Sequence, residues 1–546
     1  MRRLVSMLVL FFGSALAAQA PVQKVDEQST SHGSKAGFHN FLPANVGLVV
    51  TVTSQDRLVE LFGALAEVAL QAGLTTTEPE PPEPTVDALI ADFARSDEPV
   101  EGIDESQSLG LAIGVDLTRY VFLPSVFPED VKKALGEAPS VEKGKYVVAT
   151  DKPGYPVMTQ PLRPFSKGDI VISVRPGVWL PKLKPMADGM IEAMVGPQEP
   201  RTGRETARKT LRAAVTMLAA VLDSISQIDL ALTLDKSDVK AAVYVMPKKS
   251  GAVRGFLEAL QAAEPPSTGG LMELLDVRGG LTFHGFLPPA AMSAVLDLVP
   301  WTEASAEEKS RDDRLLRRLI NNALAQLDGR LAYGISLTGE PLVLSGGAVV
   351  GIRKVEDFRQ SIQGLYESEA AKHSMESLAN AVPGLELKLR REVFHIDQIA
   401  VDTLEEKLAL PGQGSLRAAT HFLAQGDHAF LVFARDSTDR GAVEAFLRRA
   451  SLASAAKSKP LRAKPAGEKR FLRGTVEWGE FLLLGKSPST ESRVARPKAS
   501  TRFELTAGEI SLVLVTRTSL PAIAKVIAAA WKLAPTSTRR SEQAGK

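Results

Sequence analysis

Apolar positions along the chain follow the period of a strand, then the period of a helix. From Ile228 to Leu234 every second residue is a large aliphatic one, which is typical of a strand with one buried face. Residues 236–238 form a polar turn, and an apolar run to Met246 predicts a returning strand. Apolar residues then recur at i, i+3, i+4 and i+7 from Val253 to Leu260, which predicts an amphipathic helix.

The same succession of strand, turn, strand and helix recurs. A second copy begins near His421 and turns at Gly426-Asp427. Its helix starts GAVEAFLRRA at Gly441, against GAVRGFLEAL at Gly251, with five identities in ten positions. Looser copies cover residues 331–365, 503–531 and 109–135. The pattern predicts duplicated ββα modules in an α+β fold, with mainly antiparallel sheets and helices packed on one face.

Polar breaks predict how the chain is divided. Thr302–Asp313 is polar and charged, and we expect it to separate a first α+β domain, residues 38–301, from a second, residues 312–535. Thr75–Thr85 carries four Pro and three Glu and predicts an extended, exposed loop. We expect residues 536–546 to form a disordered tail.

The beginning of the chain has the features of an export signal. Arg2 and Arg3 precede a largely apolar run, Leu4–Leu16, and Ala15-Leu16-Ala17 fits the small-x-small cleavage pattern. This run is too short to cross a hydrocarbon core of about 30 Å. We therefore expect a signal peptide at 1–17, a flexible leader at 18–37, and a periplasmic or secreted protein without a transmembrane segment.

Composition narrows the chemistry. The chain has no Cys, which excludes disulfides, thiolate nucleophiles and a lipid-anchored N-terminal Cys. Apolar residues make up 44% and charged residues 24%, as in ordinary globular proteins. Loss of Arg2 and Arg3 with the signal changes the formal net charge from +1 to −1, so charge gives no argument for binding nucleic acid.

A short motif at the start of the expected ordered region carries a resemblance. Phe41-Leu42-Pro43-Ala44-Asn45 leads into a predicted strand, Val46–Val52, and Gly285–Pro289 repeats the Leu-Pro pair. The chain resembles a poorly characterised family of exported bacterial proteins, known as a domain of unknown function, with a Leu-Pro-Ala-Asp-like motif. Asn45 stands where that family more often has Asp. The resemblance implies an extracytoplasmic α+β protein over most of residues 38–535 and assigns no catalytic residue.

Three motifs approach known catalytic or phosphate-binding patterns and fail on spacing or order. Gly479–Ser487 has five residues between its glycines, where a phosphate-binding loop needs four. Ser454-x-x-Lys457 follows Lys249-Ser250-Gly251, the reverse of the order in penicillin-recognising enzymes. Neither a Gly-x-Ser-x-Gly elbow nor His-Glu-x-x-His occurs. We predict no catalytic, cofactor-binding or metal-binding residue.

Histidines and acidic pairs are expected to be solvated. Only His421 and His428 lie close in sequence. A turn at Gly426-Asp427 places His428 opposite Gln425 and His421 near Val432, about 13 Å apart along the hairpin, too far for one metal. Glu405-Glu406 and Asp312-Asp313 are adjacent pairs that diverge on a helix.

Two basic segments leave one binding hypothesis open. Lysines and arginines gather in residues 457–473 and 486–498. They form either a cationic patch for anionic lipid, glycan or a partner protein, or mobile solvated loops.

The sequence favours a non-enzymatic, extracytoplasmic protein that binds or scaffolds another molecule. A periplasmic carrier of a lipid or other apolar ligand is one alternative, and it needs an apolar cavity. A hydrolase of envelope polymers is the other, and it needs a catalytic cluster formed in space. Possible partners are another envelope protein or lipid.

Overall fold

The computed structural model describes residues 38–53, 101–152, 166–194, 218–264, 280–296, 307–372, 385–455, 469–478 and 499–522, apart from short gaps within them, together with isolated positions such as Leu271. The expected signal peptide, leader, proline-rich loop and C-terminal tail lie outside the described residues.

Among the described residues, the strands form one sheet of 18 members. Every pairing between neighbouring strands is antiparallel. From one edge to the other the order is β4 (Ser140–Lys143), β5 (Tyr146–Thr150), β3 (Arg119–Pro124), β2 (Leu109–Gly114), β1 (Val46–Val52), β6 (Ile170–Val174), β7 (Ile225–Asp235), β8 (Asp238–Pro247), β18 (Leu512–Ser519), β17 (Ser500–Ala507), β16 (Lys469–Glu477), β9 (Leu281–Phe286), β10 (Leu327–Thr338), β11 (Val343–Ile352), β15 (His428–Ala434), β14 (Gly414–Gln425), β13 (Ile399–Leu410) and β12 (Leu385–Ile396).

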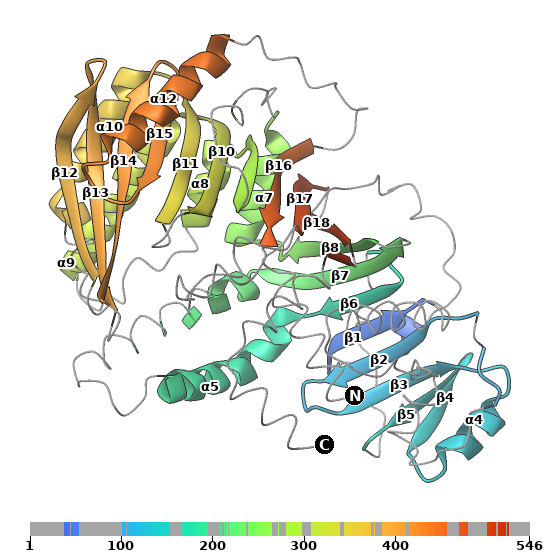
Figure 1. Ribbon diagram of the computed structural model, residues 1–546. Coiled ribbons are helices and arrows are strands. Elements are labelled where there is room, and N and C mark those ends of the chain that lie inside the picture. Colours follow the sequence, from blue (N-terminus) through green and yellow to red (C-terminus); the bar gives the residue numbers. More distant parts are fainter. Residues whose placement is uncertain are drawn as a thin grey trace.

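Strand direction changes along this sheet. In Figure 1 the strands from β12 to β15 run up the page, whereas those around β7 run across it. A right-handed twist of some 20–25° between neighbouring strands produces such a rotation. Strands β16, β17 and β18 lie between these two parts of the sheet (Figure 1).

Helices are fewer than strands among the described elements. They are the short helix η2 (Phe38–Phe41) and helices α4 (Pro128–Leu135), α5 (Pro176–Met194), α7 (Ala252–Ala262), α8 (Pro289–Leu296), α9 (Glu307–Ala325), α10 (Val355–Glu367) and α12 (Arg440–Ala455). The mixed α+β class and the antiparallel pairing are confirmed. A hairpin is followed by a helix at β2–β3–α4, β7–β8–α7, β10–β11–α10 and β14–β15–α12.

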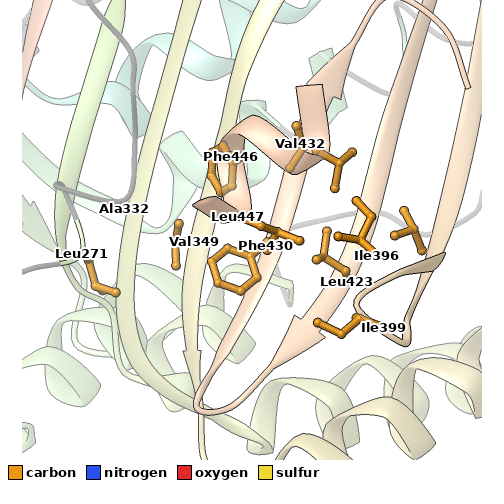
Figure 2. Close-up of a cluster of buried hydrophobic side chains, with 12 residues drawn as sticks. Leu271, Ala332, Val349, Ile396, Ile399, Leu423, Phe430, Val432, Phe446 and Leu447 are labelled. Carbon is orange, nitrogen blue, oxygen red and sulfur yellow. The ribbon is translucent and has the colours of Figure 1, made fainter. Parts of the chain in front are cut away.

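Helices cover both faces of the sheet, so the prediction of a single helical face is wrong. Val349 and Phe430 pack with Phe446 of α12, as Figure 2 shows. The neighbouring residues Val350 and Ala429 pack with the cluster that contains Phe358 of α10. Successive side chains of a strand point to opposite faces, so α12 and α10 lie on opposite sides of the same strands. These are named the α12 face and the α10 face.

The Phe41–Asn45 motif has a structural role. Phe38 and Leu42 are 0% and 1% exposed, in one core cluster with Phe122 of β3. Asn45 donates from Nδ2 to Oδ1 of Asp116 at 3.1 Å, in the turn between β2 and β3. The motif therefore ties the start of the described chain to the first hairpin.

The sheet also crosses the boundary that the sequence favours. Helix α9 begins at Glu307, inside the polar segment 302–313. Strand β9, which precedes that segment, pairs with β10 and β16, which follow it.

Both edge strands carry charge. β4 has four residues and includes Glu142 and Lys143. β12 contains Lys388, Arg390 and Arg391 and has an irregularity of register between Arg390 and Phe394. Short length, charge and bulges hinder pairing with another sheet edge.

Candidate functional site

Polar side chains gather on the α12 face of the central strands. Cross-strand registers fix this face, because residues directly opposite each other in a sheet lie on the same side. Ala332 packs in the α12-face cluster. From it, one register row runs through His284, Arg473, Glu504 and Val515.

The next register row on this face is more basic. It runs through Thr282 of β9, Thr475 of β16, Arg502 of β17, Arg517 of β18 and Lys240 of β8. We call the basic and hydroxyl-bearing members of the two rows, together with the histidine, the central patch. Its residues are Lys240, Thr282, His284, Arg473, Thr475, Arg502 and Arg517. The patch extends over five adjacent strands, which are β9, β16, β17, β18 and β8.

The spacing of the patch follows from sheet geometry. Cβ atoms of directly opposed residues lie about 4.5–5.5 Å apart, and long side chains also reach diagonal neighbours. Arg502, Arg517 and Lys240 are directly opposed in succession on adjacent strands. Like charges in such positions destabilise a sheet. Arg473 of β16 is directly opposite Glu504 of β17. Arg502 is two residues from Glu504 in β17, so Arg473 and Arg502 are diagonal neighbours.

Carboxylates balance part of this charge. Nε of Arg517 lies 3.8 Å from Oδ2 of Asp238. Glu504 is 0% exposed, on the same face as Arg473. Glu477, half-buried, continues that face of β16 beyond Thr475.

Arg473 and Arg502 are the open part of the patch. Both side chains are exposed. Within the described part of the chain, neither guanidinium forms an ion pair with a carboxylate, whereas Arg517 pairs with Asp238. These two cations are therefore available to a molecule that approaches the α12 face.

His284 lies directly opposite Arg473. Burial lowers the pKa of its imidazole, and the positive charge of Arg473 lowers it further. Its Nδ1 has no hydrogen-bond partner among the described residues. His284 is therefore neutral at neutral pH, and a negative charge placed beside Arg473 would favour its protonation.

The side chains of the central patch are suited to binding oxyanions. Guanidinium groups present planar sets of N–H donors that match phosphate and carboxylate oxygens. The hydroxyls of Thr475 and Thr282 can donate one hydrogen bond each.

The predicted positions of the two neighbouring histidines are confirmed, and their expected solvation is wrong for His421. His421 is opposite Val432, and His428 is opposite Gln425. His421 is 0% exposed, its Nδ1 lies 2.8 Å from the Thr403 hydroxyl, and burial lowers its pKa. Strand β13 and the cluster under α12 enclose this position, which the hairpin pattern alone does not reveal.

His428 belongs to a charged network at the ends of strands. Its Nδ1 lies 2.8 Å from Oδ1 of Asp427. Arg330 joins Asp427 at 3.1 Å and Asp328 at 2.6 Å. The network links the start of β10 to the β14–β15 turn.

The other sequence motifs divide between structural positions and segments outside the described residues. Glu405 and Glu406 lie in β13 rather than on a helix, so they point to opposite faces. Lys249–Gly251 joins β8 to α7. Gly479–Ser487, Lys457 and most of the two basic segments lie outside the described residues. The described end of the first basic segment supplies Arg473 to the central patch.

The central patch was not among the sites predicted from the sequence. Buried Glu504 and the pairing of β16 with both β9 and β17 are what bring its members together. The one available signal was the Lys/Arg-rich segment that ends at Arg473.

No family model, curated protein or solved structure matches this chain. In the part that the structure describes, no group of three His, Asp or Glu side chains could hold a metal ion. None of the helices described is long and apolar enough to span a membrane.

Proposed function

We propose that this chain is an exported, non-enzymatic binding protein whose open sheet serves as a binding platform. The observation that carries the proposal is the central patch, in which Arg473 and Arg502 are exposed on the α12 face. A binding surface needs accessible groups of complementary charge, and it does not need a nucleophile. The signal-like segment 1–17 supports export to the periplasm or outside the cell.

The proposal includes an internal duplication that explains where the patch lies. The first half would comprise β1 to β8 and the second half β9 to β18. Outward from the junction, each half places a hairpin, a single strand, its first strand and another hairpin: β8–β7, β6, β1, β2–β3 and β18–β17, β16, β9, β10–β11. The halves would meet through equivalent strands, as in a two-fold dimer.

The relation to the poorly characterised family of exported proteins belongs to the same proposal. It rests on the Phe41–Asn45 opening and on the repeated succession of hairpin and helix. That relation would place the binding platform in the cell envelope, where another envelope protein or a lipid is the natural partner class.

A carrier of lipid or another apolar ligand is the second candidate. The observation that favours it lies on the α10 face, where one register row consists of Val50, Ile172, Leu230, Val243 and Leu514. All five side chains are only partly buried, and Val50, Ile172 and Leu230 pack at one end of the row against a core cluster. Partly exposed aliphatic rows of this kind mark contact surfaces when they are contiguous.

The envelope-polymer hydrolase gains no support from the residues that the structure places together. His428 contacts Asp427 at the β14–β15 turn. His421 contacts Thr403 within strands β14 and β13, so the two pairs occupy different places. The described hydrogen bonds assemble no Ser, His and carboxylate together.

Native mass spectrometry of the protein purified from the periplasm of its own cell tests the proposed function. We expect a reproducible mass above that of the chain alone, from a bound small molecule or a captured protein. Extraction of the added mass into organic solvent would favour the lipid carrier. A bare chain at every protein concentration, with no partner recovered by chemical crosslinking in the envelope, would contradict the binding proposal.

A further inference from the structure

We propose that the central patch binds a ligand that carries at least two phosphate groups. This inference rests on the proposed binding function and specifies its ligand. Arg473 and Arg502 are exposed and have no carboxylate partner among the described residues. An exposed pair of guanidinium groups on one face of a sheet is a site for an oxyanion.

Thr475 adds a hydroxyl group beside Arg473 and Arg502 on the same face of the sheet. Thr475 is directly opposite Arg502 and two residues from Arg473 in the same strand. The three side chains therefore form a triangle on one face, with two cations and a hydroxyl donor. A phosphate offers three oxygens that can accept from all three at once, whereas a carboxylate offers two oxygens in a single plane.

Two further cations lie beyond this triangle. Arg517 and Lys240 continue the row from Arg502 over the next two strands. Adjacent strands lie about 4.8 Å apart, so the row extends the positive charge by roughly 10 Å from Arg502. Asp238 offsets one of these charges. A single phosphate cannot reach the whole row, and a ligand with successive phosphate groups can.

His284 lies directly opposite Arg473 on the neighbouring strand. Its imidazole is kept neutral by burial and by Arg473. A phosphate beside Arg473 would offset that positive charge, so protonation of His284 and binding would favour each other. The phosphate itself loses charge around its second pKa of about 6, so the two proteins are compared at each pH. His284→Gln should weaken binding more at pH 5.5 than at pH 7.5.

Phosphate groups of this kind come from two sources, a soluble polyphosphate or the headgroups of an anionic phospholipid surface. Inorganic tripolyphosphate, titrated calorimetrically at low ionic strength, represents the first. Vesicles of phosphatidylcholine with 30% phosphatidylglycerol (about one anionic lipid in three), used in co-sedimentation, represent the second. Binding of tripolyphosphate supports the inference with a soluble ligand. Binding of the vesicles alone supports it with a lipid ligand.

The test compares three full-length proteins: the natural chain, Arg473→Gln/Arg502→Gln, and the control Arg440→Gln/Arg448→Gln. The control removes the same charge from exposed positions of α12. We expect the patch variant to bind the effective probe at least tenfold more weakly, and the control to stay within about twofold. Thermal unfolding checks that the variants fold, which we expect because all four side chains are exposed.

Two results would overturn the inference. One is that the natural protein binds neither probe. The other is that the control loses as much affinity as the patch variant, which would mean attraction by overall charge. If either result is found while native mass spectrometry still shows a bound molecule or partner, the phosphate inference falls and the binding function stands. If neither probe binds, native mass spectrometry shows only the bare chain and crosslinking recovers no partner, both the phosphate inference and the binding function fall.

Discussion

At the scale of single residues, burial decides the behaviour of the histidines. His421 is 0% exposed, lies against the Thr403 hydroxyl and faces the ring of Phe394 edge-on at 5.4 Å. His284 and His428 are more accessible, and burial also lowers the pKa of each. All three are therefore better tolerated as neutral imidazoles in the folded chain than as imidazolium ions.

Acid should destabilise the protein through His421. Its folded pKa is lowered by burial, so below the ordinary unfolded pKa of about 6.5 the unfolded state binds more protons. Stability is then complete above about pH 6.5 and declines as pH falls toward the folded pKa. In urea unfolding at pH 7.5 and 5.5, His421→Gln should lose less free energy of unfolding than the natural protein.

The exposed His395 of β12 provides the matched control for this prediction. His395→Gln should leave the loss of stability between the two pH values as it is in the natural protein. An equal loss in the His421→Gln protein would show that His421 does not carry this dependence.

A backbone position offers a stabilising change. Asp397 and Gln398 form the two-residue turn between Ile396 and Ile399, with φ of 50° and 68°. A residue other than glycine is disfavoured in this left-handed region by about 1–2 kcal/mol, and such turns favour Gly at the second position. Gln398→Gly should raise the free energy of unfolding by about 1 kcal/mol in denaturant titration.

Gln363→Gly is the matched control, and it should lower the free energy of unfolding, whereas Gln398→Gly should raise it. Gln363 is exposed in α10, and glycine there costs roughly 1 kcal/mol of helix propensity. Destabilisation by Gln398→Gly would contradict the assigned turn geometry.

At the scale of elements, α12 is held by its apolar side on the sheet. Phe446 is 4% exposed and meets Phe430 nearly perpendicularly, with ring centroids 5.9 Å apart. Figure 2 shows both rings inside the buried cluster. The helix therefore depends on contacts with β11, β14 and β15 more than on its own sequence propensity.

Truncation of Phe446 measures this dependence. Phe446→Ala removes a buried ring and should lower the free energy of unfolding by about 3–5 kcal/mol. Arg448→Ala, on the exposed side of the same helix, should change it by less than about 0.5 kcal/mol. Similar values for the two variants, from chemical denaturation, would contradict the packing of α12.

Local elements could be predicted from sequence, and distant pairings could not. The Ile228–Leu234 alternation and the helix from Val253 correspond to β7 and α7, because both patterns depend on residues close in the chain. The pairings of β9 with β16 and of β8 with β18 join segments more than 180 and 260 residues apart. Alternation identifies a buried face but not the neighbouring strand, so neither the single sheet nor the central patch was predictable.

At the scale of the whole molecule, the pairing of β8 with β18 makes the strands on its two sides one continuous sheet. It joins the eight strands from β4 to β8 in the sheet order to the ten strands that begin at β18. It also sets Lys240 opposite Arg517 and thereby completes the central patch. If β8 and β18 did not pair in this register, the basic row would not exist.

The absence of natural cysteine makes this register directly measurable. Ala242 is opposite Val515, and Val243 is opposite Leu514. Directly opposed antiparallel residues alternate between close and wide pairs, so one of these two positions brings Cβ atoms within the range that a disulfide requires.

The deciding measurement is disulfide formation, read by mass spectrometry after mild oxidation of two full-length double variants. We predict that Ala242→Cys/Val515→Cys or Val243→Cys/Leu514→Cys forms an intramolecular disulfide in high yield. The control Ala242→Cys/Val513→Cys is two residues out of register and roughly 7–8 Å apart, beyond easy bridging. Bonding in the control, or in neither matched pair, would contradict the single sheet and the site that it assembles.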